Sequence, residues 1–134
     1  MEKVINNIIR SVAYSIGGLF SGSIIMSIII GLAAQTHDSI TISGIKSGYG
    51  AGVFASIFVI MTGFIPVLLY GAPLYALTRL YGRASFLLSA LIGAAPGVFL
   101  YILSEKSSGL LFMIFGIAVG LSTHAIAKAT ERTQ

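Results

Sequence analysis

The sequence predicts an all-α polytopic membrane protein: a four-transmembrane-helix bundle with its N- and C-termini in the cytoplasm. Of the 134 residues, 56% are hydrophobic and only 9% are charged, whereas a soluble domain carries about 25% charged residues to wet its surface. The few charges leave four long stretches of chain without any. Each stretch reaches the roughly 20 residues with which a helix crosses a hydrocarbon core. We therefore expect residues 1–134 to form a single integral membrane domain.

The first span is expected at residues 12–34, in the uncharged stretch that follows Arg10. A basic start and the small residues of Gly31-Leu32-Ala33 also fit a secretory signal with its cleavage site. The apolar run is longer than the roughly 7–15 residues of a signal core, however. An uncleaved membrane anchor is therefore the favoured interpretation.

The second uncharged stretch, between Lys46 and Arg79, is too long for one straight span and too short for two. We place the span at residues 50–70. Pro66 lacks an N–H and clashes with the preceding turn, so a kink is expected one turn earlier, near residue 62.

Gly71-Ala72-Pro73 is then expected to loosen or end the helix. Residues 74–83 would follow as an interfacial helical segment. A re-entrant arrangement around Pro66 and Pro73 is the alternative. The third and fourth spans, at residues 84–103 and 109–127, are each about one bilayer long.

The basic residues predict the orientation, because cytoplasmic loops are enriched in Lys and Arg. In this topology Lys46 and Lys106 lie on one side of the membrane. The other six lie on the opposite side, which is therefore expected to be cytoplasmic: Lys3, Arg10, Arg79, Arg83, Lys128 and Arg132.

Small residues spaced four apart are the most ordered pattern in the chain. Helices in lipid associate by close backbone approach, which small residues permit. In the third span Ser85 and Ser89 extend the row of glycines, and Ser23 lies on a neighbouring stripe of the first span. We expect these faces to pack the bundle; a surface for self-association or for a partner's helix is the second interpretation. The predicted helix-packing residues are Gly18, Gly22, Gly52, Gly93, Gly97, Gly116 and Gly120.

Three titratable residues near the cytoplasmic boundary are candidates for polar, lipid or partner contacts. His124 shares a helix face with the glycines of the fourth span and would titrate near neutral pH. Arg79 and Arg83 are one turn apart, which suits phosphate headgroups. The plainer interpretations are a structural hydrogen bond for the histidine and topology-setting charge for the arginines.

Several function classes have no support in the sequence. His37-Asp38 lacks a third metal ligand, no nucleophile or nucleotide motif is present, and cysteine is absent, so we expect no enzyme activity, metal or cofactor. The basic residues form no nucleic-acid-binding patch. Ion-coupled transport is disfavoured because no Asp, Glu, Lys or Arg lies inside a predicted span.

The composition resembles that of a bacterial inner-membrane protein, with the lipid bilayer as its main partner. The leading hypothesis is a small multi-pass accessory protein that binds a membrane-protein partner or forms a homo-oligomer. It would modulate or protect another membrane component, as an immunity or exclusion factor does. The alternative is a small oligomeric transporter or channel, lined by hydroxyls such as that of Thr62 beside Gly63.

Overall fold

The computed structural model describes residues 2–35, 42–103 and 106–132, and within these ranges the chain is almost wholly helical. The elements are α1 (Glu2–Gln35), α2 (Ile42–Pro66), the π-helical turn η1 (Val67–Gly71), α3 (Ala72–Leu80), α4 (Phe86–Leu103) and α5 (Lys106–Arg132). Four helical segments are long and apolar enough to cross a membrane: Val4–Ala33, Gly48–Leu80, Phe86–Leu103 and Lys106–Arg132. The expected all-α polytopic membrane fold with four spanning helices is confirmed.

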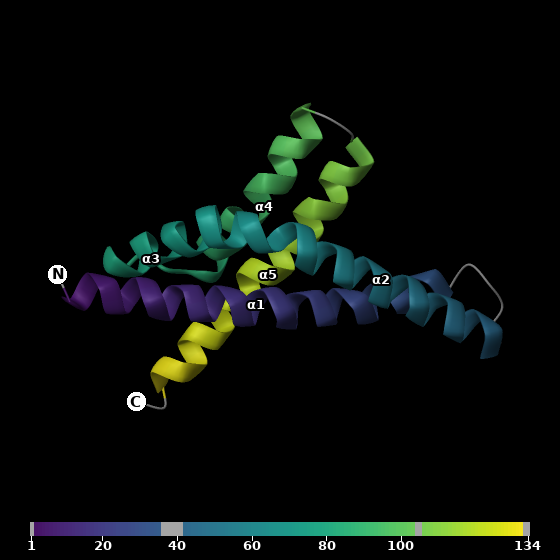
Figure 1. Ribbon diagram of the computed structural model, residues 1–134, viewed down its shortest axis with the longest axis horizontal. Coiled ribbons are helices and arrows are strands. Elements are labelled where there is room, and N and C mark those ends of the chain that lie inside the picture. The colour runs from purple at the N-terminus through teal and green to yellow at the C-terminus, as the bar shows by residue number, and fades with distance from the viewer. Residues whose placement is uncertain (1, 36–41, 104–105, 133–134) are drawn as a thin grey trace.

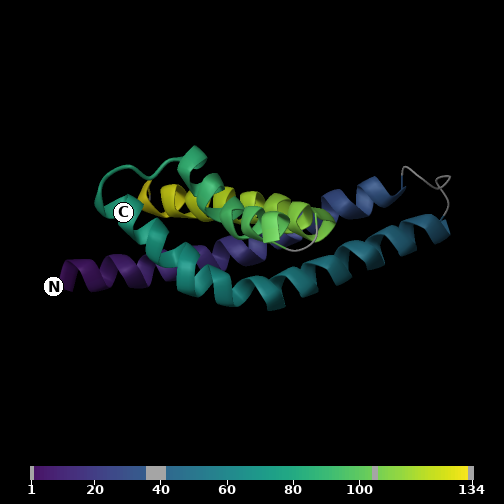
Figure 2. The same ribbon diagram turned by 90° about the horizontal axis from the view of Figure 1, so that it is seen from above.

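The four segments form two antiparallel hairpins that cross each other. One hairpin pairs α1 with α2, and the other pairs α4 with α5 (Figure 1). The main contact between the hairpins is that of α1 with α5, so α1 is the central helix of the bundle. Figure 2 shows α2 and the α4–α5 hairpin on opposite sides of α1. The two ends of the chain lie at the same end of the molecule in both views.

Small and polar side chains form the interior of this bundle, and large apolar side chains cover its outside. The buried residues include six serine and threonine residues, whereas Phe54, Met61 and Leu69 are each more than 70% exposed. Such an arrangement would aggregate in water, but it suits lipid, where helices gain most from close approach of small residues. The distribution supports the membrane assignment independently of helix length. The buried serine and threonine residues are Ser11, Ser15, Ser23, Ser56, Ser89 and Thr123.

The second span differs from the expected one around its prolines. The α-helix continues through residue 62 and Pro66 and then widens into the π-helical turn η1, in which the Ala72 N–H donates to the Val67 carbonyl. The kink expected near residue 62 stays a prediction. A π turn absorbs the hydrogen bonding that a proline interrupts, so the helix loosens here without ending. It continues as α3, which packs against α1, where Asn7 Nδ2 donates to the Ala76 carbonyl at 3.2 Å. The helical part of residues 74–83 is thus continuous with the second span, and its expected position at the membrane interface stays a prediction.

This long helix ends at Gly82, where the chain adopts a positive φ of 65°. The Gly82 N–H donates to the Arg79 carbonyl, and the Arg83 N–H donates to the Thr78 carbonyl at 2.9 Å. The pair is a Schellman termination, which favours glycine because other residues are strained at this φ. The helix of the second span therefore continues past Gly71 and ends at Gly82, where the chain turns towards α4.

Candidate functional site

The glycines of the predicted packing faces determine how closely the helices of each hairpin approach. In the α4–α5 hairpin, Gly93 and Gly116 lie against each other, so a Cβ on either would overlap the carbonyl oxygen of the other. A Cβ on Gly97 would lie 2.7 Å from the Phe112 carbonyl carbon, and one on Gly120 would lie 2.8 Å from that of Ser89. These contacts bring the two backbones together along much of their length.

The remaining glycines of the pattern pack other helices against two different faces of α1. Gly18 and Gly22 face α5, where a Cβ on Gly22 would come within 2.8 Å of the Val119 backbone. Gly52 lies on α2, where a Cβ would overlap the Ser27 carbonyl oxygen of α1. One face of α1 thus holds its hairpin partner, and the other face holds the second hairpin.

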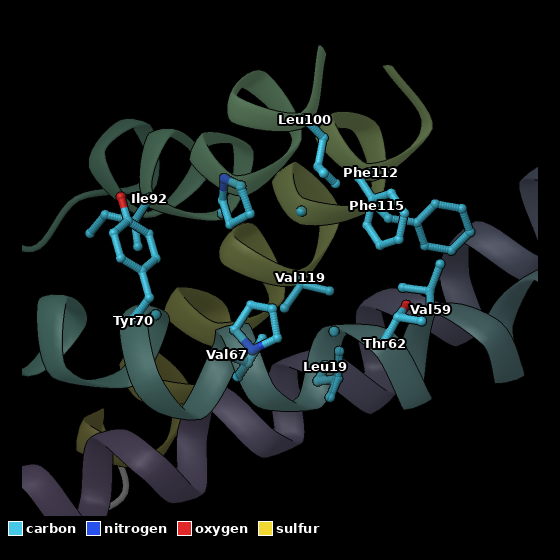
Figure 3. Close-up of a pocket in the computed structure, with 16 residues that line it drawn as sticks. Leu19, Val59, Thr62, Val67, Tyr70, Ile92, Leu100, Phe112, Phe115 and Val119 are labelled. Carbon is cyan, nitrogen blue, oxygen red and sulfur yellow. The ribbon is translucent and has the colours of Figure 1, made fainter. Parts of the chain in front are cut away.

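An apolar cleft lies between the hairpins, because α2 and α4 diverge on either side of α1. It has a volume of about 290 Å³ and is not enclosed. Figure 3 shows Val59 and Val67 on one wall, Ile92 and Phe112 on the opposite wall, and Leu19 of α1 below them. The lining is almost entirely apolar. The cleft therefore suits a hydrophobic occupant.

Glycine and proline residues shape both walls of the cleft. Gly63 and Pro66 lie on the α2 side, and Gly93 and Pro96 lie on the α4 side. Glycine contributes no side chain to fill the space, and the π turn after Pro66 diverts the helix axis. Thr62 also lines the cleft, but its hydroxyl donates to the Phe58 carbonyl at 2.7 Å, within its own helix. The hydroxyl expected to line a pore is thus bonded to the backbone.

A second, smaller pocket continues the cleft towards the end where the termini lie. Its volume is about 40 Å³, and it shares part of its lining with the cleft, including Ile92 and Val119. Three hydroxyl-bearing residues, Ser15, Ser89 and Thr123, also line it, but apolar atoms make up nearly all of its surface. We call it the hydroxyl pocket.

The Ser89 hydroxyl is buried close to the hydroxyl pocket without a partner. Ser89 is 3% exposed, and its Oγ makes no hydrogen bond. Serine and threonine in helices often donate to the carbonyl four residues earlier, as Thr123 does to Val119 at 2.8 Å. Ser23 Oγ is the other buried unpartnered hydroxyl of the described residues, but it lines none of the pockets described here.

His124 contacts Tyr75, a residue that lines the hydroxyl pocket. Its Nδ1 forms a hydrogen bond with the Tyr75 hydroxyl at 3.0 Å, and Tyr75 lines the pocket. The imidazole also meets the Phe86 ring edge to face, with 4.5 Å between ring centroids. These contacts join α3, α4 and α5, so His124 occupies a fixed place in the packing.

The two predicted arginines have different environments. Arg79 pairs with Glu131 of α5, donates to Ser11 Oγ at 3.5 Å and lies 5.2 Å from the centre of the Tyr14 ring. Its side chain is only 14% exposed, so its guanidinium is already engaged within the chain. Arg83 follows the end of α3 and is exposed. Of the two, Arg83 is the one that remains open to a lipid headgroup or partner.

Other candidates from the sequence are not brought together. His37-Asp38 lies outside the described residues, and within the described ranges no three His, Asp or Glu side chains could hold a metal ion. Sequence reasoning missed the cleft, the hydroxyl pocket and the Arg79–Glu131 pair. The signals that pointed towards them were the prolines of the second and third uncharged stretches and the row containing Ser89.

Comparison with known proteins identifies no relative: no protein-family model, curated protein or solved structure matches this chain.

Proposed function

We propose that the protein is a small multi-pass membrane accessory protein that binds another component of the membrane and so modulates or protects it. The observation that carries the proposal is the apolar cleft between the two hairpins, which is not enclosed and lies among the membrane-spanning helices. An opening that faces the bilayer would admit molecules from it. Apolar concave sites with a few convergent polar groups are the usual form of ligand sites.

The size of the cleft decides which component can enter it. A cavity of about 150 Å³ holds one benzene molecule, and this cleft, at about 290 Å³, is nearly twice as large. The cleft therefore has room for a small hydrophobic molecule or a single lipid chain.

Filling the cleft tests this proposal. Gly63 lines the cleft, and a Cβ there meets only Leu19 Cδ1, at 3.4 Å, so Gly63→Leu should fill the space without displacing backbone. Gly50 lies on the same helix with nothing within 4 Å of its Cβ, so Gly50→Leu is the matched control. Native mass spectrometry of protein released from membranes should find a retained hydrophobic molecule on the parent and on Gly50→Leu. Gly63→Leu should lose it.

Two results would overturn the proposal. One is a parent protein that retains no molecule under conditions in which its fold is intact; the other is equal retention by Gly63→Leu. The alternative function, a small oligomeric channel or transporter, is tested in parallel with liposomes that contain only this protein. Solute flux that persists in Gly63→Leu would favour the channel.

The location is also a proposal: a bacterial inner membrane, with both termini on the cytoplasmic side. It is supported by the basic residues near the ends of α3 and α5, of which Arg83 and Lys128 are exposed. A fluorescent protein that folds only in the cytoplasm, fused after Gln134, should be fluorescent. If the fluorescent fusion is dark, and a fusion at the same position to a phosphatase that works only in the periplasm is active, the orientation is the reverse of the proposed one.

A further inference from the structure

We infer that a groove between the end of α3 and the start of α4 binds an anionic phospholipid. Arg83 pairs with the lipid phosphate, and leucines of both helices contact the beginning of an acyl chain. We call this site the Arg83 groove. It shares no lining residue with the apolar cleft, so the inference does not rest on the proposed function. The groove is lined by Leu74, Leu77, Thr78, Tyr81, Arg83 and Leu88.

The Arg83 groove lies where two membrane-spanning segments end. The second span ends at Leu80 and the third begins at Phe86. The turn between them lies at the same end of the molecule as both termini (Figure 2). Leu77 belongs to the last turn of one span and Leu88 to the first turn of the next, whereas Arg83 lies between the two spans. The groove therefore extends from the headgroup region, where lipid phosphates lie, into the hydrocarbon.

The first observation is that Arg83 has no counter-ion. Its side chain is exposed and forms no ion pair or hydrogen bond within the described residues. Arg79, one turn earlier, pairs with Glu131 and is only 14% exposed. A guanidinium presents a planar set of donors that matches a phosphate group. Arg83 thus supplies an uncompensated positive charge at the depth of the lipid phosphates.

The turn after α3 holds Arg83 beside the other polar residues of the groove. The Arg83 N–H donates to the Thr78 carbonyl at 2.9 Å, and Gly82 supplies the positive φ that this turn requires. The Thr78 hydroxyl donates to the Tyr75 carbonyl at 2.8 Å, so its proton is already used. Tyr81 is 77% exposed, which suits the interfacial aromatic belt of a membrane protein. Arg83 is therefore the cationic donor of the groove.

The second observation is the apolar wall beside that charge. Leu74 and Leu77 of α3 and Leu88 of α4 line the groove, whose volume is about 490 Å³. A cavity of about 150 Å³ holds one benzene molecule, so the groove has room for part of an acyl chain. A free phosphate ion would use Arg83 alone, whereas a phospholipid uses both the charge and the leucines.

The net charge of the headgroup decides between lipids. A zwitterionic phospholipid carries its own ammonium group, which competes with Arg83 for the phosphate. An anionic phospholipid has no such competitor, and its charge compensates that of the guanidinium. The Arg83 groove should therefore prefer phosphatidylglycerol to phosphatidylcholine.

The experiment uses a reporter that the chain does not otherwise contain. Tryptophan is absent, so Leu77→Trp places the only indole in the Arg83 groove. Leu87→Trp reports the bulk lipid, because Leu87 is 73% exposed on the first turn of α4 and lines none of the pockets described here. The probes are phosphatidylglycerol and phosphatidylcholine with the same dibrominated acyl chain, because bromine quenches indole fluorescence. Each probe is diluted into nanodiscs of unbrominated phosphatidylcholine. Tyr81→Trp is a second groove reporter if Leu77→Trp disturbs the fold.

Phosphatidylglycerol should quench the groove indole at about fivefold lower mole fraction than phosphatidylcholine, which is the attraction of one basic residue for an anionic membrane surface. Arg83→Gln should abolish this preference, and Arg83→Lys should retain part of it, since an ammonium group also attracts phosphate. Arg132→Gln is the matched control, because it removes another exposed arginine, and the same charge, away from the groove. It should leave the preference unchanged.

Three results would overturn the inference. If Arg83→Gln and Arg132→Gln reduce the preference equally, or if Leu87→Trp shows the same preference as Leu77→Trp, the attraction comes from net charge and the groove is not a lipid site. If both probes quench the groove indole equally, Arg83 does not select the lipid. If 10 mM inorganic phosphate abolishes the preference, Arg83 binds a free anion and the assignment to a lipid is wrong. None of these results bears on retention of a molecule in the cleft, so the proposed function is tested separately.

Discussion

Replacing Gly93 by alanine should separate the two helices of the α4–α5 hairpin. A Cβ on Gly93 would overlap the Gly116 carbonyl oxygen and lie 2.7 Å from its carbonyl carbon. Because the obstacle is backbone, it cannot rotate away as a side chain would. The helices must therefore move apart or shift along each other, and the contacts of Gly97 and Gly120 on the same face would loosen with them.

The expected cost follows from that geometry. Overpacking a close interface is destabilising by about 1–3 kcal/mol, and a clash between two backbones lies at or above the upper end of this range. Gly50→Ala is the control, because a Cβ at Gly50 meets nothing within 4 Å. Alanine is the better helix former by about 1 kcal/mol, so the control should be neutral or stabilising.

A double-mutant cycle makes this prediction sharper. Gly93 and Gly116 face each other in one contact between α4 and α5. Gly116→Ala should therefore lower the free energy of unfolding about as much as Gly93→Ala. The double variant should lower it by much less than the sum of the two. Unfolding in mixed detergent micelles, followed by helix content and by thermal midpoint, measures all four proteins. If Gly93→Ala and Gly50→Ala have equal stability, or if the two interface substitutions are additive, close backbone approach is not what holds this hairpin.

Three further predictions concern other contacts. Tyr75→Phe removes the partner of His124 Nδ1 and should lower the free energy of unfolding by about 1 kcal/mol in the same micelle assay; no change would mean that the bond is not formed in the membrane. Glu131→Gln should lower the free energy of unfolding by at most about 1 kcal/mol, because Glu131 is half exposed. Arg79→Ala should lower it more, because this substitution also removes the contacts with Ser11 and the Tyr14 ring. A larger effect of Glu131→Gln than of Arg79→Ala would refute this account of the pair. Pro66→Ala restores an N–H inside the helix and should let the π turn relax, which narrows the cleft and lowers retention of its occupant in native mass spectrometry; unchanged retention would show that the proline does not shape the cleft.

The spanning helices could be predicted because the thickness of the membrane fixes their length. The third span was expected at residues 84–103, and α4 covers Phe86–Leu103. The fourth was expected at residues 109–127, whereas α5 extends over Lys106–Arg132. A helix need not end where the hydrocarbon ends, since its own hydrogen bonds continue into the interface. Hydropathy therefore identifies the core of a span better than its ends.

The path of the second span could not be predicted from local rules. Proline predicts a break, but whether the chain kinks, ends or widens depends on the neighbouring helix. Here Ala72, Tyr75 and Ala76 are buried beyond the prolines. That packing holds α3 against α1, and the chain accommodates Pro66 with a π turn.

The candidate site was predicted only in part, because it is assembled from segments far apart in the chain. The row containing Ser89 and Gly93 indicates which face of the third span packs closely. It does not indicate that the Ser89 hydroxyl lacks a partner, which depends on residues of α1, α3 and α5 around it. The cleft itself exists because α2 and α4 diverge. The residue pattern of a single helix cannot predict how two helices diverge.

The central position of α1 has a consequence for how the chain can be divided. Each hairpin has its own close contacts: Gly52 against Ser27 in the first, and Gly93 against Gly116 in the second. Only the short turn after α3 connects them covalently, and the face of α1 with Gly18 and Gly22 supplies most of their contact. A chain cut at Gly82 should therefore insert as two independent halves and reassemble in the bilayer. The chain is thus built from two hairpins that associate mainly through one face of α1, and the cleft lies at the boundary between them.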